Sequence, residues 1–308
     1  MKRKIVYVMG AGRSGSTVLD ILLGSNPGVI STGELVHLHG RGWTENHYCA
    51  CGERVSDCAF WSAVKENWSQ KATADIPSYL ELQRRFDRIR NVVFPARLKS
   101  ESRFRDYLRD TGAIVDAILD VSGQPVLVDS SKKPPRGFFL SLLAGFDVYV
   151  IHLVRDPRGF VWSKAKLLAK DERAGVQAEQ RPRALLETVV EWILANVVSA
   201  LVSRRMGDRA MQVRYEDFVA NPKQELERIS QLCGVDFTDC LKRLDAGGTF
   251  APGHTVAGNR VRMNRNLTLK VDEEWKDRLP SRRKRLISLV TSPWLVKYGY
   301  PLGSSATS

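Results

Sequence analysis

The stretch that decides the fold is Gly10-Ala11-Gly12-Arg13-Ser14-Gly15-Ser16-Thr17. It follows an apolar run at residues 4–9, which predicts a buried strand, and precedes residues 17–25, whose apolar side chains share one face of a predicted helix. A glycine-rich loop between a strand and a helix is typical of a phosphate-binding loop, because glycines let the backbone fold around an anion and the first helical N–H groups point at it. A plain glycine turn is the alternative.

The loop departs from the nucleoside-triphosphate pattern G-x-x-x-x-G-K-[ST] at one position, where Ser16 replaces the lysine. That lysine holds the β- and γ-phosphates of a triphosphate. Here the cation comes earlier, at Arg13, and hydroxyl groups line the loop. A single sulfate or phosphate tail therefore suits this loop better than ATP does. We expect the ligand to contact Gly12, Arg13, Ser14, Gly15, Ser16 and Thr17.

Strands and helices alternate along most of the chain, which predicts an α/β fold with a parallel sheet and helices on both faces. Further strands are expected at 29–31, 125–128, 148–154 and 210–214, and helices at 134–144, 158–170, 183–205, 223–233 and 281–290.

One block departs from this alternation. Residues 37–75 are predicted to be irregular, and residues 78–122 mainly helical with an interruption near Pro95. We interpret 37–125 as an insertion that shapes the acceptor side of a single domain spanning 1–303, with a flexible tail at 304–308.

The chain carries 47 Lys and Arg against 34 Asp and Glu, a net charge of +13. Such a field attracts anions. Nucleic acid is one candidate, although zinc-finger, homeodomain-like and RNA-binding aromatic motifs are lacking. A polyanionic nucleotide cofactor or an acidic acceptor explains the charge equally well, and no nucleic-acid partner is expected. No apolar run approaches the roughly 20 residues of a membrane span, and the first strand leaves no room for a signal peptide. A soluble, cytoplasmic protein is expected.

Three of the five cysteines, Cys49, Cys51 and Cys58, lie close together in the sequence. Three thiols with a fourth ligand such as His47 can bind zinc. The spacing lacks a second paired knuckle, so a reduced, packed loop or a single disulfide bridge are the alternatives.

Two segments together resemble the family of sulfotransferases that use 3'-phosphoadenosine 5'-phosphosulfate (PAPS). The segment Arg13-Ser14-Gly15-Ser16-Thr17 is similar to the 5'-phosphosulfate loop of the carbohydrate and tyrosylprotein branch, and the chain resembles a soluble bacterial type. Val154-Arg155-Asp156-Pro157-Arg158-Gly159, with Ser163, resembles the family's 3'-phosphate motif. The resemblance implies that Arg155 and Ser163 hold the 3'-phosphate of PAPS.

Two later segments resemble the same family more loosely. Residues 213–218 are similar to a stretch in which a tyrosine, here Tyr215, contacts the adenine. Residues 254–262 are similar to a glycine-containing loop that closes over the nucleotide, which implies roles for Asn259 and Arg262.

Sulfuryl transfer to an alcohol needs a base and cations near the departing phosphate. Glu34 follows the second short strand and resembles the base of tyrosylprotein sulfotransferases, with His37 and His39 as rival bases. Lys132 is expected at the end of the neighbouring strand, where it would contact the bridging oxygen, and Arg13 is expected as a further catalytic cation. Lys133 is the alternative to Lys132. No metal is required.

Two other functions remain open on the sequence: a small-molecule kinase and a non-catalytic polyanion-binding protein. For the sulfotransferase, a sugar hydroxyl on an oligosaccharide or glycolipid is the expected acceptor. A lipid, a peptide tyrosine and a natural-product alcohol are alternatives, and a lipid acceptor would bring peripheral membrane contact. Trp43, Trp61 and Trp68 either stack on a sugar or anchor the core.

Overall fold

The centre of the molecule is a five-stranded sheet in which every pair of neighbours is parallel. The computed structural model describes residues 2–98, 100–176, 179, 181–264, 267, 269 and 271–303. The strand order is β2-β3-β1-β4-β5. The strands are β1 (Arg3–Met9), β2 (Val29–Ser31), β3 (Val126–Lys132), β4 (Phe146–Val154) and β5 (Ala210–Arg214). The predicted parallel α/β class is confirmed.

Alternate residues of β1 pack on opposite faces of the sheet, as the twofold period of a strand requires. Ile5, Tyr7 and Met9 belong to one core cluster, and Val6 and Val8 to another. The second cluster is completed by α1 (Ser16–Gly24), α9 (Tyr215–Ala220), α10 (Pro222–Cys233) and α11 (Thr238–Asp245). The first is completed by α6 (Pro134–Leu140), α8 (Leu185–Met206) and the helices of the insertion. Helices therefore cover both faces.

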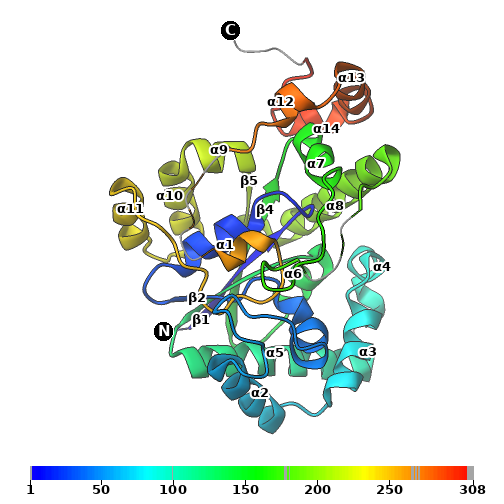
Figure 1. The fold of residues 1–308 in the computed structure, drawn as a ribbon. Coiled ribbons are helices and arrows are strands. Elements are labelled where there is room, and N and C mark those ends of the chain that lie inside the picture. Colours follow the sequence, from blue (N-terminus) through cyan, green and yellow to red (C-terminus); the bar gives the residue numbers. More distant parts are fainter. Residues whose placement is uncertain are drawn as a thin grey trace.

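The insertion lies below and to the right of the sheet in Figure 1. It comprises α2 (Ala59–Lys71), α3 (Ile76–Phe86), α4 (Ile89–Val93), a 3-10 turn at Pro95–Leu98 and α5 (Ser102–Ser122). The expectation that 37–75 is irregular was wrong. Besides α2, the segments Leu35–His37 and Leu38–Thr44 are short helical turns. Helix α2 buries Trp61, Val64 and Trp68, whose helical spacing was a usable signal in the sequence.

Two element boundaries differ from the prediction in ways that affect the site. Strand β3 continues to Lys132 instead of ending at 128, so Lys132 is the last strand residue. Helix α7 (Pro157–Lys164) ends well before residue 170. The chain closes with α12 (Trp275–Arg278), α13 (Ser281–Val290) and α14 (Ser292–Lys297), which gather at the opposite end from the insertion (Figure 1). The expected tail at 304–308 lies outside the described residues.

Helix α8 bears on the expected lack of a membrane span. The segment Leu185–Arg209 is long and apolar enough to cross a membrane by length and composition, with 39% of its apolar window buried. The core helix of a soluble protein passes the same test, and α8 packs against β4, α6 and α7. The absence of a membrane-spanning segment therefore stays a prediction.

Candidate active site

A cleft of about 1350 Å³ opens at the carboxyl-terminal edge of the sheet, where ligands bind in open α/β folds. Most of the residues that the sequence singled out line it. They are Gly12, Arg13, Gly15, Ser16, Thr17, Glu34, Lys132, Arg155, Ser163, Tyr215, Asn259 and Arg262. Ser14 is not part of the lining, and its side chain is buried. Segments from both ends and the middle of the chain thus meet in one place.

The loop between β1 and α1 needs its glycines for different reasons. Gly10 has a φ of 142°, and a Cβ there would lie 2.3 Å from the carbonyl oxygen of Leu153. Gly15 has a φ of 86°, and a Cβ there would lie 2.3 Å from Cδ2 of Tyr215. Arg13, between them, adopts a positive φ of 66° without being glycine. Such left-handed conformations in non-glycine residues cluster at functional sites, where the surrounding structure enforces them.

The start of α1 has the character of an anion site. Gly15 is its N-cap, and no side chain caps the helix. The hydroxyl oxygens of Ser14 and Ser16 are buried and have no hydrogen-bond partner among the described residues. Buried polar groups rarely stay unpaired. An anion at this helix start would accept hydrogen bonds from Ser16, which lines the cleft, and from the first backbone N–H groups of α1, so this helix start fits a sulfate or phosphate group.

Arg155 emerges from the end of β4 and is almost fully buried. Its Nη1 donates to the carbonyl oxygen of Arg13 at 2.9 Å, and its Nη2 donates to Oδ2 of Asp272 at 3.0 Å. Its guanidinium lies over the ring of Tyr215, 4.6 Å from the centroid. Its Nε, however, has no partner in the described part of the chain. The side chain is therefore held rigidly and keeps one donor for a ligand.

Ser163 lies on α7, the helix that follows Arg155. Asp156 caps this helix by accepting a hydrogen bond from the backbone of Arg158, and Pro157 occupies its first turn. The cap fixes the direction of α7 and so turns Ser163 toward the same cleft as Arg155.

Glu34 and Lys132 form an ion pair inside the cleft, in which Nζ of Lys132 donates to Oε1 of Glu34. Nε2 of His37 lies 3.4 Å from the other carboxylate oxygen. Burial opposes ionisation of Glu34, but Lys132 and then His37 outweigh it and hold the pKa of this carboxyl well below its ordinary value. Lys132 also has a positive φ of 66°, which aims it from the strand end. Glu34 is thus a buried carboxylate that depends on its neighbours to stay charged.

A late loop closes the cleft opposite the glycine loop. The backbone N–H of Asn259 donates to Oγ1 of Thr17 at 3.3 Å. A Cβ on Gly258 would lie 3.4 Å from Oε1 of Glu34. Arg262 is fully buried and donates to the carbonyl oxygen of Tyr48 at 3.1 Å. The late loop therefore touches both the start of α1 and the candidate base.

Three alternatives from the sequence analysis occupy other positions. His39 is buried among the rings of Trp43, Trp68 and Tyr79, outside the lining of the cleft, which argues against it as a base. Lys133 is also outside the lining, and its carbonyl accepts a hydrogen bond from Tyr7. The same aromatic packing makes Trp43 and Trp68 core anchors, and Trp61 is buried against Phe60.

The expectation that His47 completes the cysteine cluster was wrong. His47 pairs with Glu45 at 3.0 Å and lines the cleft. The histidine beside Cys49 and Cys58 is His254.

No sequence pattern pointed to Asp272, which orients Arg155 from 117 residues away. Lys164 was inside a predicted helix but was not singled out, and it lines the cleft beside Ser163. Both assignments depend on tertiary contacts that no local pattern encodes.

Comparison with known proteins agrees with this geometry. A family model described as "Sulfotransferase family" matches residues 6–239. Carbohydrate sulfotransferase 3 of Tetronarce californica is 23% identical over 230 residues, which are 70% of this chain and 52% of that protein. The chain spans about half the length of that curated relative.

Two solved structures share the fold at low sequence identity. The sulfotransferase domain of the Synechococcus PCC 7002 olefin synthase has a TM-score of 0.50 and 20% identity, and the match covers 98% of this chain and 96% of that one. The sulfotransferase domain from the curacin biosynthetic pathway has a TM-score of 0.51 and 17% identity, covering 98% and 99% of the two chains. Because the family model matches well over half of the sequence, this chain belongs to the sulfotransferase family.

Proposed function

We propose that this protein transfers the sulfuryl group of PAPS to an acceptor hydroxyl and releases 3',5'-ADP. The observation that carries the proposal is that one cleft holds the glycine loop, Arg155 with Ser163, and the Glu34–Lys132 pair. Two separate anion sites suit a nucleotide with phosphates on two different ribose carbons. A nucleoside triphosphate carries its phosphates in a single chain and has no use for the second site.

The donors without partners support the proposed assignment of each site. The Ser16 hydroxyl and the first turn of α1 would hold the 5'-phosphosulfate, aided by Arg13. The free Nε of Arg155 and the hydroxyl of Ser163 would hold the 3'-phosphate. Tyr215, packed between Gly15 and Arg155, would contact the nucleotide, with the adenine as the proposed partner. Asn259 and Arg262 would close the cleft.

When bound, PAPS supplies an electrophilic sulfuryl group on a phosphate leaving group. Glu34 is proposed to accept the proton of the acceptor hydroxyl, a role worth about 10²–10⁴-fold in rate. The ion pair couples that role to ligand binding. A bound anion would also interact with the ammonium group of Lys132 and so weaken its stabilisation of the Glu34 carboxylate. The burial of Glu34 would then raise the pKa of the carboxyl toward the range of an effective base.

Lys132 is therefore proposed to act twice. Before a ligand binds, it keeps Glu34 charged. With the ligand in place, its ammonium group is positioned near the bridging oxygen and stabilises the charge that develops there. Arg13 adds a second cation from the glycine loop, and the proposed chemistry needs no metal.

The proposed acceptor is a hydroxyl of a carbohydrate, free or on a glycolipid. Support comes from the likeness to a protein named as a carbohydrate sulfotransferase. Stacking on the insertion's tryptophans is not part of the proposal, because Trp61 and Trp68 are fully buried. Recognition would rest on the polar lining of the cleft, where Arg41, Glu45 and His47 contribute from the insertion.

The test is transfer of label from radiolabelled PAPS to a panel of acceptors: an oligosaccharide, a glycolipid, a tyrosine peptide and a simple alcohol. The proposal expects a labelled carbohydrate product that Glu34→Gln does not form, although this variant still binds 3',5'-ADP. Labelling of the tyrosine peptide alone would overturn the acceptor class. Full turnover by Glu34→Gln would remove Glu34 from the role of base.

A further inference from the structure

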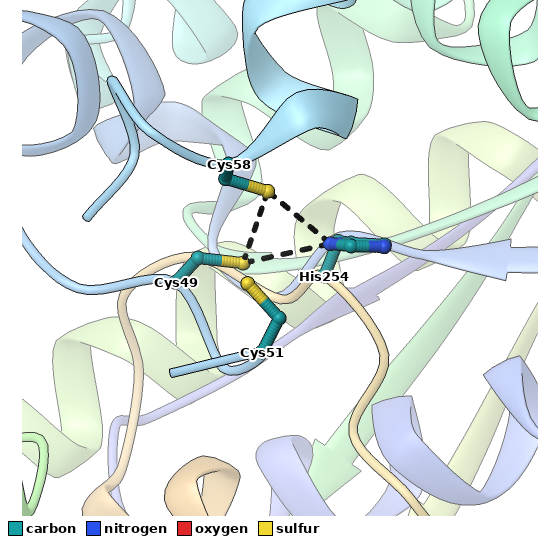
Figure 2. A group of neighbouring side chains, drawn as sticks. All are labelled: Cys49, Cys51, Cys58 and His254. Atoms are coloured by element: carbon teal, nitrogen blue, oxygen red, sulfur yellow. Dashed lines mark hydrogen bonds between the residues drawn. The ribbon is translucent and has the colours of Figure 1, made fainter. Parts of the chain in front are cut away.

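Outside the nucleotide cleft, four side chains with metal-binding atoms converge from three segments of the chain. They are Cys49, Cys51, Cys58 and His254, and their ligand atoms all lie within 4.8 Å of one another. Figure 2 shows the sulfur atoms of Cys49 and Cys58 facing the imidazole ring, with the sulfur of Cys51 beside that of Cys49. Since His254 is 205 residues from Cys49, this grouping is a product of the tertiary fold.

The separations among Cys49, Cys58 and His254 match a tetrahedral zinc site, and the Cys51 sulfur lies within 4.8 Å of all three. Zn–S bonds of about 2.3 Å at tetrahedral angles place neighbouring sulfur atoms about 3.8 Å apart. The Sγ atoms of Cys49 and Cys58 are 3.9 Å apart, and Nδ1 of His254 lies 3.9 Å from the first and 3.3 Å from the second. Three cysteines with one histidine are an established ligand set for structural zinc. We infer that these four residues bind one structural Zn²⁺ ion.

The local backbone orients the ligands before any metal is bound. Tyr48 and Arg54 form an antiparallel bridge, and within it the N–H of Cys49 donates to Glu53 at 2.8 Å. Gly52 turns this hairpin with a φ of 100° and donates to the carbonyl of Cys49 at 3.0 Å. The hairpin therefore presents Cys49 and Cys51 from a tight turn.

The other two ligands are fixed by α2. Cys58 is the N-cap residue of this helix. One turn later, Nε1 of Trp61 donates to the carbonyl oxygen of His254 at 2.8 Å. The ring of Phe60 stacks on the imidazole, with 4.9 Å between centroids and 17° between planes. These contacts set the position of His254 and leave Nδ1 facing the thiols.

A buried cation beside the cluster supports an anionic metal centre. Zinc with three thiolates and a neutral imidazole carries a net charge of −1. Arg262 is fully buried and binds the carbonyl oxygen of Tyr48, the residue next to Cys49. Its Nε has no hydrogen-bond partner among the residues that the structure describes. A buried guanidinium needs a compensating charge, which the metal centre would supply.

The metal site would tie the insertion to the loop that closes the nucleotide cleft. Two residues beyond His254, Val256 exchanges backbone hydrogen bonds with Thr32 at 2.9 Å and with Glu34 at 3.0 Å. Thr255 accepts a hydrogen bond from Ala50 at 3.0 Å. Zinc would therefore hold the late loop against the candidate base. Loss of zinc would release this loop and weaken nucleotide binding. Only this effect on nucleotide binding rests on the proposed function.

The test is metal analysis of the full-length protein, purified under reducing conditions without chelators. We expect one zinc ion per chain in the wild type and loss of zinc in Cys58→Ser and His254→Ala. His47→Ala and Cys233→Ser are the matched controls, since His47 pairs with Glu45 and Cys233 lies in α10, and both should keep the metal. Replacement by Co²⁺ should give the absorption of a tetrahedral site with thiolate ligands.

A measurement on the wild type covers the case in which the variants fail to fold. A chelator should remove the zinc, expose three more thiols to a thiol reagent and weaken binding of 3',5'-ADP, and added Zn²⁺ should reverse all three changes. Wild-type protein without zinc, a Cys49–Cys58 disulfide, or full zinc content in both ligand variants would overturn the inference. If zinc is present but 3',5'-ADP never binds, the metal site stands and the proposed function fails.

Discussion

The ammonium group of Lys132 donates a hydrogen bond to the carboxylate of Glu34, 98 residues earlier in the sequence. The pair joins the end of β3 to the turn after β2, two strands that are neighbours in the sheet. Because the carboxyl ends of parallel strands share one edge, both side chains reach the cleft. The contact makes the charge state of the candidate base depend on the candidate charge stabiliser.

Replacement of Lys132 by methionine should shift the pH dependence of turnover. Without the ammonium group, burial of Glu34 is no longer outweighed, so the pKa of the carboxyl rises. The acid limb of kcat/KM should move to higher pH, and the maximal rate should fall by about 10²–10³-fold. Lys133→Met is the control, since Lys133 lies outside the cleft. An acid limb that does not move would contradict the coupling.

Gly15→Ala should abolish nucleotide binding for a steric reason. The new methyl group would lie 2.3 Å from the ring of Tyr215 at a residue with a φ of 86°. Gly28→Ala separates the steric clash from the backbone strain. Gly28 has a similar φ of 82°, but a Cβ added there would have no atom within 4 Å. We expect Gly28→Ala to keep wild-type affinity in a titration with 3',5'-ADP. Equal losses in both variants would show that backbone strain alone matters.

Arg155→Ala should weaken binding of 3',5'-ADP by about 10- to 100-fold, because a hydrogen bond to a charged group is lost. Binding of ADP, which has no 3'-phosphate, should change much less. Lys166→Ala removes another cation of the cleft and should weaken both nucleotides to a similar extent. Competition titrations with the two nucleotides measure the difference. An equal effect of Arg155→Ala on both would separate this residue from the 3'-phosphate.

Asp20 should make the stability of the protein depend on pH. Burial within α1 raises the pKa of its carboxyl to about 8, whereas an unfolded chain has an ordinary value near 3.9. Between these values the folded state holds a proton that the unfolded state releases, so stability falls as pH rises. The slope is on the order of 1 kcal/mol per pH unit.

Asp20→Asn removes this titration. The free energy of unfolding of this variant, relative to wild type, should therefore increase from about pH 4 to pH 8. Denaturant unfolding at several pH values measures it, with the exposed Asp57→Asn as control. A constant difference across that range would show that Asp20 is ionised in the folded protein.

The parts of the fold and site that the sequence predicted are those encoded locally. The strand before Gly10, the glycine loop and α1 follow from apolar spacing and glycine placement within about 20 residues. Arg155 and Ser163 were found in the same way, as a strand end and the helix after it. Their position in one cleft with Glu34 follows from the parallel sheet, which puts all carboxyl strand ends on one edge.

The parts that the sequence did not predict depend on contacts between distant segments. His254 joins the cysteines through long-range contacts, among them those of Trp61 and Phe60, which hold its loop against α2. His47, nearer in sequence, was the natural guess and was wrong. The extension of β3 to Lys132 was not predictable either, because residues 129–132 are polar and do not resemble a buried strand. The positive φ of Lys132, also unusual for a strand residue, is visible only in the structure.

The central claim is that the cleft binds a nucleotide with a separate 3'-phosphate. The most direct test is isothermal titration of the wild-type protein with 3',5'-ADP and with ADP in the same buffer. We expect 3',5'-ADP to bind at least about 10-fold more tightly, since the 3'-phosphate adds a charged hydrogen bond to Arg155. Binding of ADP with equal or higher affinity would contradict it.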